Sequence, residues 1–225
     1  ALGGPHRAVS FSVPTGNFGD IYAGYLAQQM GLPIEQLGIA TNANDILHRL
    51  ISSNLYSKHP LQHTLSPSMD IVISSNFERL LFDCYGRDGA AITELMNNFS
   101  KGDVKLSESA FAKARALFDS HAVDDKATVA TIGEVWGKAE YLLDPHSAIG
   151  VKAARECRRN TTTPMITLAT AHPAKFPDAV KQAGYPNDVP LPHHMADLFQ
   201  REERLTVLPH DISKVQQFIA ANIKA

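Results

Sequence analysis

The chain has 225 residues, of which 44% are hydrophobic and 20% charged, and its formal net charge is -2. This composition is typical of a globular protein of one or two domains with a substantial core. Lysine and arginine form no basic stripe, and no apolar run approaches the roughly 20 residues that span a bilayer, so nucleic acid and membrane partners are disfavoured. The two cysteines, Cys84 and Cys157, form no redox-type or metal-type pair, which predicts a reduced, cytoplasmic location.

The first 50 residues predict a βαβ unit. Residues 8–13 and 37–42 are typical of short buried strands, and a helix is predicted after each of them. The first helix follows Asp20, and the second begins near Asn44 or Asp45. Alternation of this kind favours a parallel sheet with helices on its faces, and ligands of such sheets bind beyond the carboxyl ends of the strands.

A glycine turn, defined here as residues 15–20 (Thr-Gly-Asn-Phe-Gly-Asp), joins the first strand to the first helix. The amides in the first turn of a helix have no partner within the helix, and the helix dipole favours negative charge there. The glycine turn therefore has the layout of a phosphate site that needs no lysine. The alternative is an ordinary tight turn in which Asp20 caps the helix.

The middle of the chain interrupts the strand and helix alternation. Residues 54–75 predict a loop, and a helix begins after them at Ser75 or Asn76, whose side chains suit an N-cap. Apolar spacing predicts two further helices over residues 88–100 and 107–121. Residues 54–130 are therefore predicted to form a loop and helical insertion or subdomain.

Beyond residue 130 the alternating pattern resumes. Helices are predicted over residues 131–142, 147–158, 175–183, 193–200 and 213–221, and strands over residues 165–170 and 205–208. The predicted α/β domain is thus built from residues 1–53 and 131–185. Residues 186–225 form a separate carboxyl-terminal segment of helices and one strand.

Thr170 closes the predicted strand over residues 165–170. In a parallel sheet it would lie at the same edge as the glycine turn, so that one ligand could bind a phosphate group at one end and a hydroxyl at the other. A flat phosphorylated cofactor fits that pairing. The alternative is that Thr170 only ends the strand and caps the segment that follows.

Several segments, in the same order, resemble threonine synthase. They include the Ser-Val-Pro-Thr-Gly-Asn-Phe-Gly-Asp-Ile-Tyr-Ala-Gly sequence around the glycine turn, and together they span nearly the whole chain. The remaining segments are Ala40–Asp45, Leu65–Ile71, Ser75–Arg79, Asp144–Ala148 and Leu168–Phe176.

The resemblance implies a pyridoxal phosphate (PLP) enzyme that converts O-phosphohomoserine and water to threonine and phosphate. It implies the tryptophan-synthase-β-like architecture (PLP fold type II), an α/β three-layer sheet with helices on both faces, here incomplete and carrying the helical insertion. The backbone of Gly16, Asn17, Phe18 and Gly19, with Asp20 at the rim, would hold the cofactor phosphate. Thr170 would hydrogen-bond the pyridine nitrogen, which limits ring protonation.

The chain departs from the family in its lysines. The family forms its Schiff base with a lysine in a Ser-Phe-Lys-Asp type motif that precedes the glycine turn, and no lysine of this chain has that context. The catalytic lysine is therefore expected in a missing amino-terminal half of the same protein. The 225 residues are expected to be a carboxyl-terminal fragment that is inactive alone, since the chemistry needs that lysine.

Two further residues are expected on the substrate side. Ser68 and Asp70 would line the cleft by family analogy, although a loop anchored by an Asp turn also explains them. No metal site is predicted, because His193, His194 and Asp197 are a weak ligand pattern. The alternative functions are another PLP lyase or dehydratase of the same fold type, and a non-catalytic domain that binds a phosphate ligand.

Overall fold

A parallel sheet forms the centre of the compact unit that precedes residue 190. The structure, a computed structural model, describes residues 2–3 and 6–223. Within them the sheet has four strands in the order β3-β2-β1-β4, with all neighbours parallel. The strands are β1 (Val9–Pro14), β2 (Ile34–Thr41), β3 (Phe118–Ala122) and β4 (Met165–Thr167). The parallel sheet predicted from the alternating pattern is confirmed.

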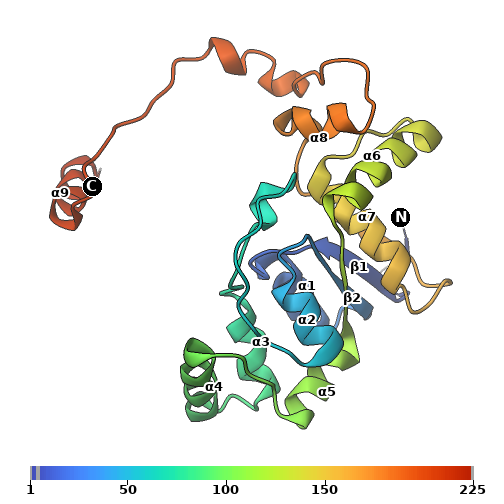
Figure 1. Cartoon of the computed structure of the whole chain (residues 1–225), viewed down its shortest axis with the longest axis vertical. Coiled ribbons are helices and arrows are strands. Elements are labelled where there is room, and N and C mark those ends of the chain that lie inside the picture. The colour runs from blue at the N-terminus through green and yellow to red at the C-terminus, as the bar shows by residue number, and fades with distance from the viewer. Residues whose placement is uncertain (1, 4–5, 224–225) are drawn as a thin grey trace. The chain divides into compact units, whose positions relative to one another are not determined.

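Helices connect and cover these strands (Figure 1). They are α1 (Gly19–Gln29), α2 (Ile46–Ser53), α3 (Phe77–Cys84), α4 (Gly89–Lys101), α5 (Glu108–Leu117), α6 (Asp125–Ala139), α7 (Pro145–Cys157) and α8 (Pro177–Gln182), whereas α9 (Ile212–Asn222) belongs to the second compact unit. Short 3-10 turns lie at Pro67–Met69, Pro173–Lys175, His193–Met195 and Leu198–Gln200.

One face of the sheet is strongly apolar and is covered by α1 and α2. Val13, Leu37 and Ile39 point to this face and form one buried cluster with side chains of both helices. Close packing needs a small residue on α1, since a Cβ at Gly24 would lie 3.1 Å from Leu37 Cδ2. Burial of the apolar cluster supplies the main force that fixes both helices on the sheet.

The opposite face carries small and polar side chains and is covered by α7. Ser12 Oγ donates a 2.7 Å hydrogen bond to the Gly150 carbonyl, and a Cβ at Gly150 would lie 2.7 Å from Thr167 Cγ2. Helix α6 packs on α7, with Ile132 and Ala148 in a shared cluster. With helices on both faces of the sheet, the predicted three-layer α/β architecture is confirmed.

Helices α3, α4 and α5 belong to the same core as the sheet. Phe77, Leu95 and Ala114, one from each helix, are buried in the cluster that also contains the apolar residues of β1 and β2. The helices predicted over residues 88–100 and near residue 76 are confirmed by α4 and α3. The division of the chain at residues 53, 130 and 185 stays a proposal.

Three predicted elements differ from the structure within the first 189 residues. Residues 118–122 form β3 instead of ending a helix, because Leu37 and Thr41 of β2 pair with Phe118 and Ala122. Helix α6 begins at Asp125, six residues before the prediction, because the Asp124 side chain accepts the Ala127 amide and caps it. Strand β4 ends at Thr167, and the Leu168 amide makes the last bond to β1.

The described residues from 190 to 223 form a second compact unit. The predicted helix over residues 193–200 is wrong, since that stretch forms two 3-10 turns closed by bonds to Pro192 and Asp197. The strand predicted over residues 205–208 is also wrong, and Leu205 and Val207 are exposed. Helix α9 confirms the predicted last helix. In the described part of the chain no helix is both long and apolar enough to cross a membrane.

Candidate functional site

The glycine turn lies at the carboxyl edge of the sheet, where β1 ends. Its first residue, Thr15, is hydrogen-bonded to the ends of two strands. The Thr15 amide donates to the Ala40 carbonyl of β2 at 2.7 Å, and Thr15 Oγ1 donates to the Val13 carbonyl of β1 at 2.6 Å. Among the described residues, the amides of Gly16, Asn17, Phe18, Gly19 and Asp20 have no hydrogen-bond partner. The turn therefore presents consecutive free donors at the start of α1.

The turn is held in shape by Phe18. This residue is the N-cap of α1 and adopts the left-handed conformation, with φ 67°, which is rare for a residue with a bulky side chain. Its ring is 1% exposed and meets the Phe77 ring edge-on, with 5.0 Å between centroids. Packing of the ring in the core thus holds the backbone in a conformation that a glycine would adopt more readily.

Asp20 does not cap the helix, so that part of the tight-turn alternative is wrong. It lies in the first turn of α1, behind the Phe18 N-cap, and is exposed. Asn17 and Gly19 are exposed as well, whereas Gly16 is half-buried. Three of the residues whose amides are free, Asn17, Gly19 and Asp20, are therefore exposed.

Residues 68–76 cover the back of the turn. A Cβ at Gly16 would lie 2.8 Å from Ile71 Cδ1 and 3.1 Å from Met69 Cα, so a side chain there would require both Ile71 and the Met69 backbone to shift. Ser74 Oγ donates to the Gly16 carbonyl, and the Ser75 amide and hydroxyl both donate to Asn17 Oδ1, at 2.8 and 2.7 Å. The turn is thus fixed from behind by a segment more than 50 residues away in sequence.

Asp70 holds a loop, defined here as the anchored loop (residues 64–71), onto the end of β2. Its Oδ1 accepts from Asn42 Nδ2 at 2.8 Å, Asn44 Nδ2 at 3.1 Å and Thr64 Oγ1 at 2.6 Å. Its Oδ2 accepts from the Thr64 amide at 3.0 Å. The structure therefore gives Asp70 the anchoring contacts of an Asp turn.

Ser68 is placed differently from Asp70. It is exposed, and its hydroxyl has no partner among the described residues, while its amide donates to His146 Nε2 at 3.3 Å. The two predicted substrate residues thus lie on one loop, but only the Ser68 side chain is free. The asparagines Asn42 and Asn44 were recognisable from their place at a strand end, whereas Thr64 and Ser74 carry no sequence signal beyond their loop context, and Ser75 was expected only as a helix cap.

Thr170 lies three residues beyond the end of β4 and is exposed. Because Ser12 of β1 pairs with Thr167 of β4, both strands end at the same edge of the sheet. Thr170 and the glycine turn are therefore at one edge, as predicted from the strand order. No hydrogen bond joins them within the described residues, and Thr170 does not close the strand itself.

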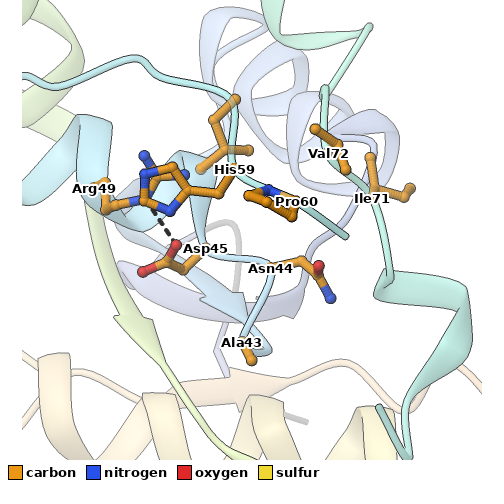
Figure 2. Close-up of a pocket in the computed structure, with 9 residues that line it drawn as sticks. Ala43, Asn44, Asp45, Arg49, His59, Pro60, Ile71 and Val72 are labelled. Atoms are coloured by element: carbon orange, nitrogen blue, oxygen red, sulfur yellow. Dashed lines mark hydrogen bonds and ion pairs between the residues drawn. The ribbon is translucent and has the colours of Figure 1, made fainter. Parts of the chain in front are cut away.

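A small pocket lies beside Asn44, at the start of α2 (Figure 2). Asp45 accepts a 2.8 Å hydrogen bond from Arg49 Nε, and Arg49 also donates to Ser57 Oγ. His59, Pro60 and Ile71 are among the other residues that line it. The cavity measures about 10 Å³. That is room for about one water molecule, so this pocket by itself does not accommodate an amino acid substrate.

No lysine contacts the glycine turn through a hydrogen bond or ion pair in the part of the chain that the structure describes. Lys58 lies over the Phe99 ring at 5.0 Å and donates to the Ser100 carbonyl, Lys101 ends α4, and Lys214 is in α9. In the described ranges there is also no group of three or more His, Cys, Asp or Glu residues that could hold a metal ion.

The chain is similar to proteins of one family. The family model described as "Threonine synthase, C-terminal" matches residues 147–219. The threonine synthase of Pseudomonas aeruginosa is 60% identical over 220 residues, which cover 97% of this chain and 47% of that protein. The threonine synthase of Saccharomyces cerevisiae is 40% identical over 95% of this chain and 46% of that protein. The chain thus spans about half the length of the curated relatives it matches.

Solved structures give the same result. The crystal structure of a PLP-bound threonine synthase from Brucella melitensis matches with a TM-score of 0.92 and 53% identity, over 100% of this chain and 48% of that one. The yeast threonine synthase structure matches with a TM-score of 0.82 and 38% identity, over 95% of this chain and 47% of that one.

Proposed function

Because the chain belongs to the threonine synthase family, we propose that it supplies the cofactor-binding turn of a PLP-dependent enzyme that converts O-phosphohomoserine and water to threonine and phosphate. A cytosolic location is part of the same proposal, and both cysteines are free thiols, as expected there.

The free amides of the glycine turn are the observation that carries this proposal. A phosphate group offers several acceptor oxygens and a charge near -2, which matches consecutive unpaired N–H donors at a helix N-terminus. The Gly16 backbone lies within contact distance of the anchored loop, and a side chain there would displace it. Residues Gly16, Asn17, Phe18 and Gly19 would hold the cofactor phosphate through their amides, with Asp20 at the exposed rim.

Thr170 would hydrogen-bond the pyridine nitrogen, at the end of the cofactor opposite its phosphate. A threonine hydroxyl can donate to a pyridine nitrogen without forcing it to carry a proton, whereas a carboxylate would favour the protonated ring. When bound, PLP supplies an electron sink for carbanions formed next to it. Thr170 is exposed at the edge shared with the glycine turn, so its hydroxyl is available for this contact.

The substrate side would be formed by the anchored loop. The Ser68 hydroxyl is free to bind a substrate group, while Asp70 is engaged by Asn42, Asn44 and Thr64. We therefore assign Ser68 to substrate contact and Asp70 to holding the loop in place. Both roles depend on the remaining part of the site, which would be contributed by the sequence that the relatives have and this chain does not.

The catalytic lysine is proposed to come from that remaining sequence. None of the lysines described above contacts the glycine turn, and none follows a Ser-Phe pair. The 225-residue chain is thus expected to show no turnover by itself. Reduction with borohydride in the presence of PLP tests this directly, since a covalent adduct on a lysine of this chain would contradict it.

The complete gene product that contains this sequence provides the main test. With PLP bound, it is expected to release phosphate from O-phosphohomoserine and to form threonine. A holoenzyme that turns over other amino acids but not O-phosphohomoserine would identify a different lyase of the same fold type. Failure to bind PLP at all would leave a phosphate-ligand binding domain.

Thr170 can be tested within the same enzyme. Thr170→Val removes the hydroxyl at nearly constant volume, and a fall in kcat of roughly tenfold or more is expected if the hydroxyl tunes the cofactor ring. Thr170→Ser keeps a hydroxyl and is the matched control. Equal activity of the valine variant and the parent would contradict the assigned role.

A further inference from the structure

A buried carboxylate and histidine pair lies at the start of α7. Asp144 is 1% exposed and His146 is 3% exposed, and Asp144 is the N-cap of the helix. Its Oδ1 accepts the His146 amide at 2.9 Å and His146 Nδ1 at 2.9 Å, and its Oδ2 accepts the Ser147 hydroxyl. Burial would raise the pKa of Asp144, but the hydrogen bonds from His146 and Ser147 outweigh it and hold that pKa below its usual range.

The partners of the ring assign its protonation. An ionised carboxylate can only accept, so His146 Nδ1 carries the proton that points to Asp144. In the neutral ring Nε2 is then an acceptor, and the Ser68 amide lies 3.3 Å from it. The His146 ring also packs on the Phe176 ring, with 4.6 Å between their centroids. His146 thus links α7 to the main chain of the anchored loop.

This link is made at the middle of the anchored loop. The loop ends are held elsewhere, by Asp125, which accepts the Leu65 amide at 3.1 Å, and by Asp70, which accepts from Thr64. Between them, within the residues that the structure describes, the amide of Ser68 makes its hydrogen bond only to His146.

The same stretch of loop lies against the glycine turn. A Cβ at Gly16 would be 3.3 Å from the Ser68 carbonyl oxygen and 3.1 Å from Met69 Cα, so Gly16 is in contact with the Ser68–Met69 peptide, which directly follows the Ser68 amide that donates to His146. A shift of this peptide would move the backbone that shapes the first free amides of the turn. The contacts form one continuous path, from Asp144 through His146 and Ser68 to Gly16.

We propose that His146 is a positioning residue that accepts the Ser68 amide and thereby keeps the following Ser68–Met69 peptide against Gly16, and that Asp144 keeps the His146 ring in the tautomer this requires. The pair thereby fixes the free amides of the glycine turn for the phosphate group of the cofactor. This inference rests on the function proposed above. It assigns a role to the Asp-Pro-His-Ser sequence that the cofactor and substrate contacts leave without one.

Two substitutions separate the bonds of His146 in the complete enzyme. His146→Asn keeps a donor near Asp144 but is too short to reach Ser68, whereas His146→Gln extends far enough to offer an acceptor to the Ser68 amide. We expect hydrogen exchange at the Ser68 amide to be about fivefold faster in His146→Asn, the effect of one hydrogen bond. The dissociation constant for PLP is expected to rise by a similar factor, about fivefold. His146→Gln should recover much of both.

Ser147→Ala is the matched control, because it removes a different hydrogen bond to Asp144 and leaves the Ser68 contact in place. It is expected to leave Ser68 exchange and PLP affinity unchanged. Equal losses in Ser147→Ala and His146→Asn would overturn the positioning role, and so would unchanged Ser68 exchange in His146→Asn. If His146→Asn does not fold, His146→Phe, which offers no acceptor, is compared with His146→Gln and Ser147→Ala: faster Ser68 exchange in His146→Phe alone supports the role, and equal exchange in all three overturns it.

The two proposals fail in different ways. A parent enzyme that binds no PLP overturns the proposed function, while the exchange rate of the Ser68 amide still reports on His146. A parent enzyme that binds PLP, with an affinity that His146→Asn does not change, overturns only the positioning role.

Discussion

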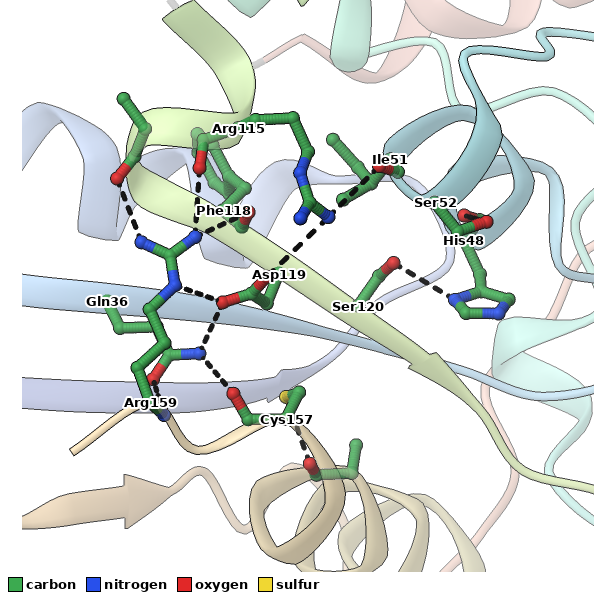
Figure 3. A network of polar contacts seen from close by, with 12 residues as sticks. Gln36, His48, Ile51, Ser52, Arg115, Phe118, Asp119, Ser120, Cys157 and Arg159 are labelled. Carbon is green, nitrogen blue, oxygen red and sulfur yellow. Dashed lines mark hydrogen bonds and ion pairs between the residues drawn. The ribbon is translucent and has the colours of Figure 1, made fainter. Parts of the chain in front are cut away.

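The two edges of the parallel sheet differ in how completely their polar groups are paired. At the amino edge, Arg159 donates to Asp119 and to the carbonyls of Arg115, Ala116 and Phe118 (Figure 3). At the carboxyl edge, the amides of residues 16–20 have no partner within the described residues. Saturated polar groups favour stability, whereas free donors in a preformed turn favour binding.

The amino edge is closed at β2 and β3 by residues from these two strands and from the ends of α5 and α7. Gln36 of β2 donates to Asp119 Oδ2 at 2.8 Å and accepts the Arg159 amide at 3.1 Å (Figure 3). Arg159 follows α7, and Asp119 lies in β3. The network therefore ties the end of α7 to the first residues of two strands and to the end of α5. Nothing in it is left to bind a ligand.

Removal of Arg159 is expected to have the largest effect on stability. Arg159→Ala leaves Asp119, whose side chain is 15% exposed, without its closest cation and frees several carbonyls. The free energy of unfolding should fall by about 3 kcal/mol, the lower end for a buried ion pair, because Arg159 is partly exposed. Urea unfolding measures the loss, and PLP affinity of the folded complete enzyme should not change.

The adjacent arginine gives a matched control for this edge. Arg158 bonds only to the carbonyls of Asn160, Thr161 and Thr163 in its own loop. Arg158→Ala should therefore cost clearly less than Arg159→Ala. A change in PLP affinity in Arg159→Ala would show that the two edges are coupled and would break the contrast.

A methyl group at Gly16 should affect both stability and binding. Gly16→Ala places a Cβ 2.8 Å from Ile71 Cδ1 and 3.1 Å from the Met69 backbone. Overpacking of this kind costs about 2 kcal/mol of unfolding free energy. The displaced backbone also moves the free amides. Gly16→Ala should therefore weaken PLP binding more than Arg159→Ala or Arg158→Ala does.

Gly89→Ala is the control for this substitution. Gly89 begins α4, and a Cβ there meets no atom within 4 Å. It should leave PLP affinity unchanged and cost no stability, because alanine is the better helix former. If Gly16→Ala binds PLP as tightly as Gly89→Ala does, the glycine turn is not the phosphate site.

Substitutions of Asn17 should have a smaller effect on stability. Two of them separate the loss of a hydrogen-bond acceptor from the addition of a negative charge. Asn17→Ala removes the acceptor for the Ser75 amide and hydroxyl and should cost about 1 kcal/mol of unfolding free energy. Asn17→Asp keeps an acceptor for Ser75 and adds a negative charge beside the free amides. It should therefore retain stability but weaken PLP binding, which thermal unfolding and PLP titration measure separately. Equal binding by the aspartate variant would contradict an anion site.

Short-range signals made the sheet and the glycine turn predictable. The strand, turn and helix pattern of residues 8–29 lies within one stretch of sequence, and β1 and α1 confirm it. The sequence did not predict strand β3, because its polar residue Asp119 is stabilised by residues that are distant in the sequence. Its partners Arg159 and Gln36 are 40 and 83 residues away, and local propensity carries no information on such contacts.

The site was predictable in its residues but not in its geometry. The sequence carried no sign that the left-handed residue of the turn is Phe18, which is held by packing against Phe77. Asp70 was expected on the substrate side, and its contacts with Asn42 and Thr64 show an anchoring role that depends on how the loop folds back. Such features arise from tertiary contacts.

A carboxylate at each edge should lose its contribution to the stability of the fold at low pH, and only the one at the carboxyl edge should also affect the anchored loop. Asp144, at the carboxyl edge, has a lowered pKa because hydrogen bonds from His146 and Ser147 outweigh its burial. Its contribution to stability is therefore complete above the unfolded value of about 4 and is lost as the pH falls through the lower folded value. The stability difference between the parent and Asp144→Asn should accordingly shrink as the pH falls below about 4.

Glu35, at the amino edge, also has a lowered pKa, because Thr163 and Asn160 donate to it, and Glu35→Gln reports that contribution separately. Ser68 exchange distinguishes the two edges, since it should change with Asp144→Asn and not with Glu35→Gln. A stability difference between the parent and Asp144→Asn that stays constant over this range would show that the Asp144 charge does not stabilise the fold.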